Sequence, residues 1–147
     1  MSCDCGERSV VVSDKAPKAI GPYSGAIKAK LFVFTSGQLG IDPETGSLVD
    51  GGVEAETRQA LTNLKLFLEA AGSCLDCVVK TTVFLRDIGD FSRMNSVYAE
   101  FFSKEPPARS AFQVAALPKG AAVEIEAVAM VCQHDDKQTG CCCTKEE

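Results

Sequence analysis

The sequence lacks tryptophan altogether, and its single histidine, His134, lies in a polar stretch near the C-terminus. Histidine is the side chain that most often moves protons in catalysis, and single-stranded nucleic acids are bound largely by stacking bases on aromatic rings. The body of this chain therefore has no histidine for RNA cleavage and no tryptophan for base stacking. Both absences disfavour an enzyme that acts on RNA.

Long apolar runs are also missing. A membrane-spanning helix needs about 20 predominantly apolar residues, and no stretch of the chain approaches that length. Residues 1–7 lack the charged-then-apolar pattern of a signal peptide, and their acidic residues are unlike those of a mitochondrial transit peptide. We therefore expect a cytoplasmic protein with no membrane partner.

Positive charge is scarce too. The net charge is −5, the isoelectric point is about 4.9, and no long basic run occurs. A protein whose main task is to neutralise a nucleic-acid backbone needs clustered lysine and arginine, so we expect no nucleic-acid partner. The length of 147 residues suits one domain that buries its own core.

Cysteine is present in number but unevenly placed. Five of the eight cysteines lie at the ends: Cys3, Cys5, Cys141, Cys142 and Cys143. Only Cys74, Cys77 and Cys132 lie in the body, which is unlike the even spread of a disulfide framework.

The spacing of Cys74 and Cys77 is typical of a zinc or redox pair. A tetrahedral zinc site needs two more ligands, and the histidine lies in the tail. A redox pair is expected at a helix N-terminus, whereas this pair follows a predicted helix. The sequence therefore favours ordinary, partly buried thiols and no metal.

Apolar periodicity predicts an α+β domain. Residues 53–71 repeat apolar side chains at helical spacing, with charged residues, Glu56 among them, mostly elsewhere on the helix and Gly72 at its end. Asp90 is expected to cap a second helix over residues 91–102. Strands are predicted over residues 9–13, 24–30, 31–36, 78–85 and 122–128. A further strand is predicted to begin at Arg109. The order predicts a six-stranded sheet with both helices covering one face.

We divide the chain into a flexible N-terminal segment, residues 1–8, a folded domain, residues 9–132, and a disordered cysteine-containing tail, residues 133–147. In the strand of residues 78–85, both alternating sets of side chains are largely apolar or β-branched. Two helices cover only one face of the sheet. We therefore expect other subunits to cover the second face.

Arg109 opens an apolar strand, and Glu124 and Glu126 lie within the next one. The guanidinium is permanently charged and forks onto carboxylates with two parallel hydrogen bonds. Buried charge is usually paired, so two readings remain open from the residues alone. Either Arg109 pairs internally with a glutamate, or it awaits an anionic ligand.

Five sequence blocks, in order along residues 10–131, resemble one family. They are Gly21-Pro22-Tyr23-Ser24, Thr35-Ser36-Gly37-Gln38, Met94-Asn95-Ser96-Val97-Tyr98, Pro107-Ala108-Arg109 and the run from Leu117 to Glu126. The chain resembles the RidA branch of the YjgF family, the reactive enamine/imine deaminases, and is most similar to its animal-type members. The resemblance implies a chorismate-mutase-like fold with a mixed six-stranded sheet and two helices on one face. It also implies a homotrimer with a central barrel and clefts between neighbouring subunits.

The resemblance implies an activity as well: hydrolysis of the 2-imino acids that pyridoxal-phosphate-dependent serine and threonine dehydratases release, giving 2-oxo acids and ammonia. By family position, Arg109 holds the substrate carboxylate, and Glu124 holds the water and shuttles the proton, with desolvation by Val123 and Ile125 raising its pKa. Several bacterial members carry cysteine where this chain has Ala111. A thiol nucleophile there is excluded, and no cofactor is expected.

Four other residues have a family role and a local alternative. Tyr23, Ser36 and Asn95 match substrate-contact positions, but they also suit a loop anchor, a turn hydroxyl and a solvent-facing helix residue. Glu126 shares a strand face with Glu124, and we expect it to be a structural partner of a lysine or a backbone amide.

Two other functions remain open at this point. One is a single-strand endoribonuclease and translation inhibitor, as animal-type members have been described. The other is a non-catalytic trimer that binds small carboxylates or acts as a chaperone, because sites rather than folds carry function.

Overall fold

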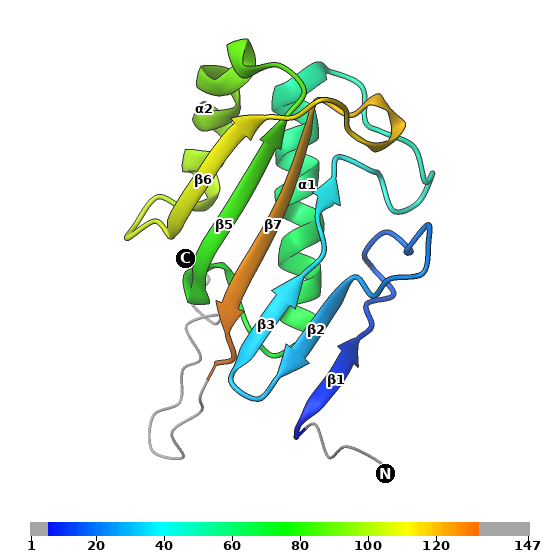
Figure 1. Ribbon diagram of the computed structural model, residues 1–147, viewed down its shortest axis with the longest axis vertical. Helices are drawn as coiled ribbons and strands as arrows, with labels where there is room; N and C mark the ends of the chain where they lie inside the picture. The colour runs from blue at the N-terminus through cyan, green and yellow to red at the C-terminus, as the bar shows by residue number, and fades with distance from the viewer. Residues whose placement is uncertain (1–5, 133–147) are drawn as a thin grey trace.

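The computed structural model describes residues 6–132, and the tail predicted over residues 133–147 lies outside them. The described residues form a seven-stranded sheet in the order β1-β2-β3-β7-β5-β6, with β4 also paired to β7 (Figure 1). The strands are β1 (Arg8–Val11), β2 (Ala26–Ala29), β3 (Phe32–Thr35), β4 (Gln38–Leu39), β5 (Val78–Leu85), β6 (Ala108–Gln113) and β7 (Val123–Met130). The helices are α1 (Gly52–Ala70) and α2 (Phe91–Phe101), with short 3₁₀ turns η1 (Leu75–Cys77), η2 (Ile88–Asp90) and η3 (Pro118–Gly120).

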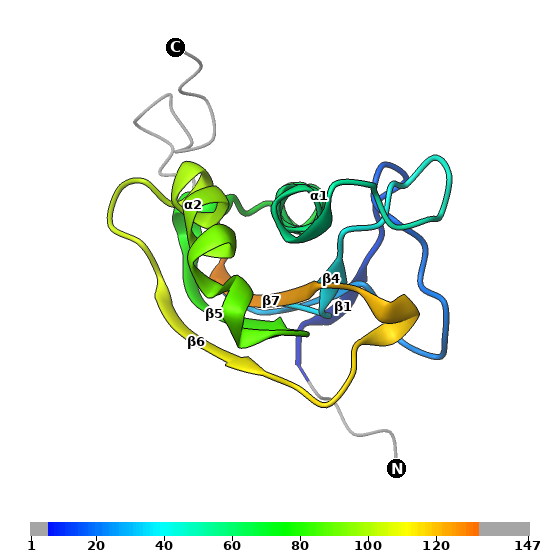
Figure 2. The same cartoon turned by 90° about the horizontal axis from the view of Figure 1, so that it is seen from above.

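Both helices lie on the same face of the sheet (Figure 2). Alternate side chains of the long central strands point into this layer, so that Val83 of β5 and Ile125 of β7 are fully buried. Leu61 and Leu64 of α1 are fully buried in the same core. The apolar stripe of α1 is what holds the helix on the sheet, since burial of large aliphatic side chains is the main favourable term in folding.

The sheet is mixed. β5 and β6 pair in parallel across the α2 crossover, and the other pairings are antiparallel. The predicted α+β class, the mixed sheet and the two helices on one face are confirmed. The six predicted strands are present, and β4 adds a seventh. With two residues it is too short to show a sequence period, and its pairing with β7 defines it.

The face of the sheet opposite the helices is uncovered in the single chain and carries an apolar patch beside Lys80 and Glu126. It carries Phe34 of β3, 47% exposed, and Phe112 of β6, 45% exposed. Phe84 of β5 packs edge-to-face on Phe112, with ring centroids 5.4 Å apart. Exposed aromatic patches of this kind mark interaction surfaces. Within the part of the chain that the structure describes, no helix is long and apolar enough to cross a membrane.

Candidate functional site

A pocket of about 290 Å³ opens beside β4, where the start of β7 meets the loop that precedes β2. Three of the predicted site residues line it: Tyr23, Ser36 and Glu124. The other walls are Pro17, Lys18, Ala19, Ile20, Gly25, Gly37, Gln38, Leu39, Ile41, Phe67 and Pro118. The structure therefore brings together residues from the first, second and last of the sequence blocks.

Glu124 is the carboxylate of this pocket. Its pKa is raised above the usual value, first because burial disfavours the charged form and second because the Glu126 carboxylate lies nearby. The predicted direction of the shift and its main cause, desolvation, agree, but Val123 and Ile125 are not the side chains that bury the carboxylate. Val123 and Ile125 point to the helix-covered face of β7, whereas Glu124 points to the opposite one.

Gly37 is the close neighbour that shapes the surroundings of Glu124. A Cβ atom at this position would overlap the Glu124 carboxylate, so the side chain lies directly against the Gly37 backbone. The backbone of Gly37 does not have a positive φ, which means that space rather than conformation requires glycine here. The motif that contains Gly37 was recognised in the sequence, but this contact depends on the pairing of β4 with β7.

Glu56 holds the backbone that leads to Glu124. Its carboxylate is buried and accepts a hydrogen bond of 2.7 Å from the N–H of Ala122. Glu56 is buried although the sequence placed it off the apolar stripe of the helix, because helical periodicity does not reveal the orphan backbone N–H of Ala122, just before β7. A charged acceptor for a buried N–H is among the stronger hydrogen bonds in proteins. Glu56 is therefore a positioning residue that sequence reasoning missed.

Asn63 performs a similar task on the other wall. Its side-chain amide donates to the carbonyls of Leu39, at 3.2 Å, and Ile41, at 2.8 Å, and the residue is fully buried. These bonds hold the segment around β4 against α1. A buried asparagine among the apolar positions of α1 is the signal that could have identified it.

Tyr23 and Ser36 line the pocket and also fix its loops. The Tyr23 hydroxyl accepts a 3.3 Å hydrogen bond from the N–H of Ile20, which leaves its own O–H proton available to a ligand. The Ser36 hydroxyl donates to the carbonyl of Ser24 at 2.6 Å. Both local alternatives, the loop anchor and the turn hydroxyl, are therefore true of this chain. They do not conflict with ligand contact, because both residues line the pocket.

Arg109 lies elsewhere. It pairs in register with Thr81 of β5, so its side chain projects to the helix-covered face and lies over two aromatic rings of α2. The guanidinium carbon is 4.6 Å from the centroid of Tyr98 and 5.6 Å from that of Phe91. This cation–π arrangement holds the planar group in one orientation.

The expected proximity of Arg109 to the glutamates is wrong within one chain. Glu124 and Glu126 project to the opposite face of the sheet, with β5 between their strand and that of Arg109. Among residues 6–132, no salt bridge involves Arg109. Of the two readings left open, the internal Arg–Glu pair is contradicted, and a guanidinium ready for an anion remains.

Asn95 accompanies Arg109 rather than Glu124. It lies on α2 four residues after Phe91 and three before Tyr98, the spacing that places side chains on one helical face. The sequence offered no reason to expect a role in the site for Phe91 or Tyr98. In the structure the Arg109 guanidinium packs on both rings, and Asn95 lies on the same side of the helix.

Glu126 has no lysine partner among the described residues. Together with Lys80 it lines a shallow hollow of about 150 Å³ on the uncovered face. The Lys80 ammonium donates to the Ser110 hydroxyl at 3.0 Å, and no ion pair of the described chain joins it to Glu126. Glu126 acts on the site through its negative charge, which raises the pKa of Glu124.

The predicted site thus exists as two groups. One holds a carboxylate of raised pKa, a phenol and a hydroxyl around a pocket, and the other holds a guanidinium stacked on two rings. The first group suits proton transfer, and the second suits recognition of a planar anion. An α+β subunit that combines a carboxylate pocket with an anion-recognising guanidinium belongs to the class of small-ligand enzymes.

The family follows from comparison with known proteins. Residues 13–131 match the family model described as endoribonuclease L-PSP, and the chain belongs to this family. It is 54% identical, over 84% of its length and 90% of the relative's, to a protein of Bos taurus named 2-iminobutanoate/2-iminopropanoate deaminase.

Solved structures agree with this assignment. The YjgF gene product of E. coli superposes with a TM-score of 0.80 at 42% identity, covering 83% of this chain and 98% of that one. E. coli TdcF with bound serine superposes with a TM-score of 0.80 at 40% identity, over 83% and 98% of the two chains. The family resemblance read from the sequence blocks is confirmed.

Proposed function

We propose that the protein is a deaminase that hydrolyses 2-imino acids, the 2-iminobutanoate and 2-iminopropanoate class, to 2-oxo acids and ammonia. Mammalian relatives that share about half of its residues carry that name, including those of Bos taurus and Homo sapiens. The observation that supports the mechanism is the presence of two groups that a ligand can use. One is the Arg109 guanidinium, which has no ion-pair partner among the described residues, and the other is the Glu124 carboxylate in the pocket, whose pKa is raised. A small acid with a reactive carbon beside its carboxylate matches both.

Arg109 binds the substrate carboxylate. Its guanidinium presents parallel N–H donors in a fixed plane, and Tyr98 and Phe91 restrict that plane. Clamping the carboxylate orients the adjoining C=N carbon, and such positioning supplies a large part of the rate enhancement in reactions of this type. Lysine offers a point charge without the fork and is expected to serve poorly.

Glu124 manages water and proton. Its carboxylate accepts a proton from a water molecule as the oxygen adds to the C=N carbon, and it delivers that proton to the nitrogen. The resulting carbinolamine collapses to the C=O bond of the 2-oxo acid and releases ammonia. A pKa raised by burial brings the carboxyl group closer to the working pH, which favours proton transfer in both directions.

The complete site requires a second subunit. In one chain Arg109 and Glu124 lie on opposite faces of the sheet, so a substrate held by one cannot reach the other. A homotrimer, with the uncovered apolar face turned inward as a central barrel, places the Arg109 group of one subunit beside the Glu124 pocket of the next. The exposed Phe34 and Phe112 support this arrangement, because association would remove them from water.

The experiment measures ammonia release from imino acid generated in place by a threonine or serine dehydratase. The protein is expected to accelerate the release, and Arg109→Ala is expected to abolish the acceleration. Arg58→Ala is the matched control, because Arg58 pairs with Glu100 on the surface of the helices, away from both groups. Full activity in Arg109→Ala would refute the assignment. Imaging of the tagged protein checks the predicted cytoplasmic location.

The name of the family makes RNA cleavage the second candidate. The chain's one histidine, His134, lies outside the described residues, and the net charge is −5. Neither favours binding or cleaving a polyanion. RNA cleavage by a purified sample that persists in Arg109→Ala and disappears on further purification would identify a contaminating nuclease. Cleavage that copurifies with the protein and is lost in Arg109→Ala would support the second candidate.

A further inference from the structure

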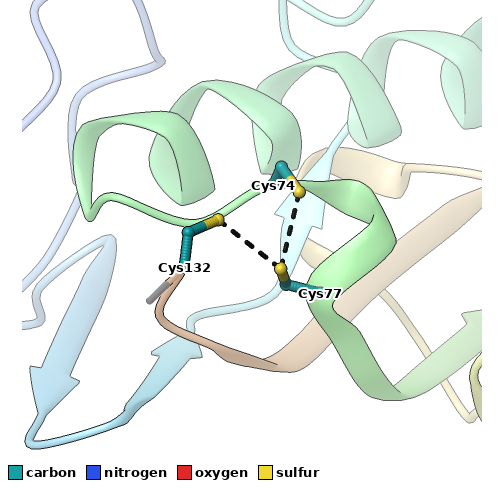
Figure 3. Close-up of side chains that lie close together, drawn as sticks. All are labelled: Cys74, Cys77 and Cys132. Carbon is teal, nitrogen blue, oxygen red and sulfur yellow. Dashed lines mark hydrogen bonds between the residues drawn. The ribbon is translucent and has the colours of Figure 1, made fainter. Parts of the chain in front are cut away.

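Three cysteines lie close together near the end of β7 (Figure 3). Cys74 follows α1, Cys77 ends η1, and Cys132 follows β7. The Sγ atom of Cys77 lies 3.6 Å from that of Cys74 and 3.5 Å from that of Cys132, and all three sulfurs lie within 4.8 Å of one another. The sequence supplied the spacing of the first pair, and the fold adds a third thiol 55 residues further along the chain.

Backbone hydrogen bonds hold these segments together. The N–H of Cys77 donates to the carbonyl of Cys74 at 3.1 Å, which closes the η1 turn. The N–H of Cys132 donates to the carbonyl of Gly72 at 2.9 Å, and the Ser73 hydroxyl donates to the carbonyl of Met130 at 2.6 Å. The positions of the thiols are therefore set by the fold, so a ligand that needs all three finds them already assembled.

The separations suit a metal ion. Sulfurs bound to one tetrahedral ion at the usual Zn–S distance of about 2.3 Å lie about 3.8 Å apart, close to the two separations of 3.6 Å and 3.5 Å. Thiolates select zinc and other soft ions over magnesium and calcium. Cys74 is buried, whereas Cys77 and Cys132 are half-buried, so an ion can approach from solvent.

We propose that Cys74, Cys77 and Cys132 form a three-thiolate site for one thiophilic metal ion of the zinc type. The bound ion ties the end of α1 to the end of β7. Each thiol that binds gives up its proton, so the affinity rises with pH.

This site is separate from the pocket. Glu124 lies near the start of β7, and Cys132 follows its end at Met130. The strand between Glu124 and Met130 is roughly 20 Å long at about 3.3 Å per residue. At this distance we expect metal binding to leave the pocket unchanged. Its expected effect is on the free energy of unfolding, because the ion links the end of α1 to the end of β7.

The test begins from full-length protein in which the five terminal cysteines, Cys3, Cys5, Cys141, Cys142 and Cys143, are serine, so that only the three body thiols remain. The reduced protein is titrated with Zn²⁺ against a chromophoric chelator. We expect one ion per chain and a thermal midpoint that rises with Zn²⁺. Cys77→Ser in this background is expected to weaken binding about 100-fold or more, since loss of an outer-shell partner alone weakens metal sites 10- to 100-fold.

A second variant, Cys132→Ser, serves the same purpose if Cys77→Ser does not fold, with circular dichroism of the metal-free proteins as the check. Co²⁺ gives an independent readout, because thiolate ligation produces a charge-transfer absorption that each Cys→Ser change should reduce. The proposal is overturned if the background protein binds no Zn²⁺ under reducing conditions, or if either variant binds it as tightly as the background protein does. Formation of a disulfide between two of the three thiols, without metal affinity in the reduced state, also overturns it.

Discussion

Arg109 and Glu124 lie on opposite faces of the same sheet. Arg109 is level with Thr81 on β5, and Thr81 is level with Ala127, three residues along β7 from Glu124. At a strand spacing of about 4.8 Å and a rise of about 3.3 Å per residue, their Cα atoms are roughly 14 Å apart. The two side chains extend away from each other, so a small substrate can meet both only across a subunit boundary.

A mixing experiment tests this arrangement. Arg109→Ala and Glu124→Gln are each expected to be inactive alone, but co-assembled trimers should regain activity. With random assembly of equal amounts, about one quarter of the sites combine an intact Arg109 from one subunit with an intact Glu124 from its neighbour. Ammonia release near that fraction of the wild-type rate is the expected result.

Each variant mixed with wild-type protein, without co-assembly, provides the control for simple dilution. Analytical ultracentrifugation establishes that the species is a trimer. If the co-assembled mixture stays inactive while both variants form trimers, the shared site is excluded.

Glu124→Gln separates a catalyst from a carboxylate-binding protein. The variant keeps the shape of the side chain and loses proton transfer, so turnover is expected to fall about 100-fold or more, within the usual range for a general acid–base group. Binding of a 2-oxo acid, measured by calorimetry, should be retained through Arg109. Unchanged turnover would move the proton-shuttle role to Glu126 or to a water molecule held by the backbone.

The same variant has an expected effect on stability. The pKa of Glu124 is raised in the folded protein, so its ionisation opposes folding. Stability linked to this group is fully present below the ordinary pKa of 4.5 and is lost as the pH rises through the raised value. Glu124→Gln should therefore unfold at a higher temperature than wild type near neutral pH, and the difference should vanish in acid.

Glu126→Gln is expected to shift the pH dependence of the reaction. Activity should fall in acid as Glu124 becomes protonated, and the negative charge of Glu126 contributes to the raised pKa of Glu124. Removal of that charge lowers the pKa, so the acid limb of kcat/KM should move to lower pH. Glu126→Asp keeps the charge and should leave the limb close to its wild-type position. Loss of the limb in Glu126→Gln would instead identify Glu126 as the titrating group.

Gly37→Ala is expected to disable the site and leave the fold intact. The added methyl group would overlap the Glu124 carboxylate, and the flexible side chain can move aside where backbone cannot. A displacement of about 1 Å at a catalytic group can lower the rate about 100-fold.

Gly21→Ala is the control for Gly37→Ala, because its new Cβ would meet the Tyr23 ring at an ordinary 3.6 Å. Rates of ammonia release and thermal midpoints are compared for both variants. Wild-type turnover in Gly37→Ala would show that the position of the carboxylate tolerates more freedom than the close packing indicates.

Much of the secondary structure was predictable because each element carries its own period. The apolar repeat in residues 53–71 corresponds to α1, and the β-branched run in residues 78–85 has the same bounds as β5. Asp90 occupies the N-cap position of α2 as predicted, but its side chain makes no cap hydrogen bond and instead pairs with Arg93 at 3.2 Å. A cap position can be read locally, whereas the partner of its side chain depends on which residues fold nearby.

The sequence by itself determined the helices, the long strands, the family and the residue types available for chemistry, because periodicity and motif spacing are local properties of the chain. Only the tertiary structure decided which of those residues meet. Strand pairing placed Arg109 and Glu124 on opposite faces and brought Cys132 to Cys77, and the packing of α1 on the sheet buried Glu56 beneath the start of β7. Contacts of this kind join residues tens of positions apart. They follow from how the sheet and helices pack, which no short stretch of sequence encodes.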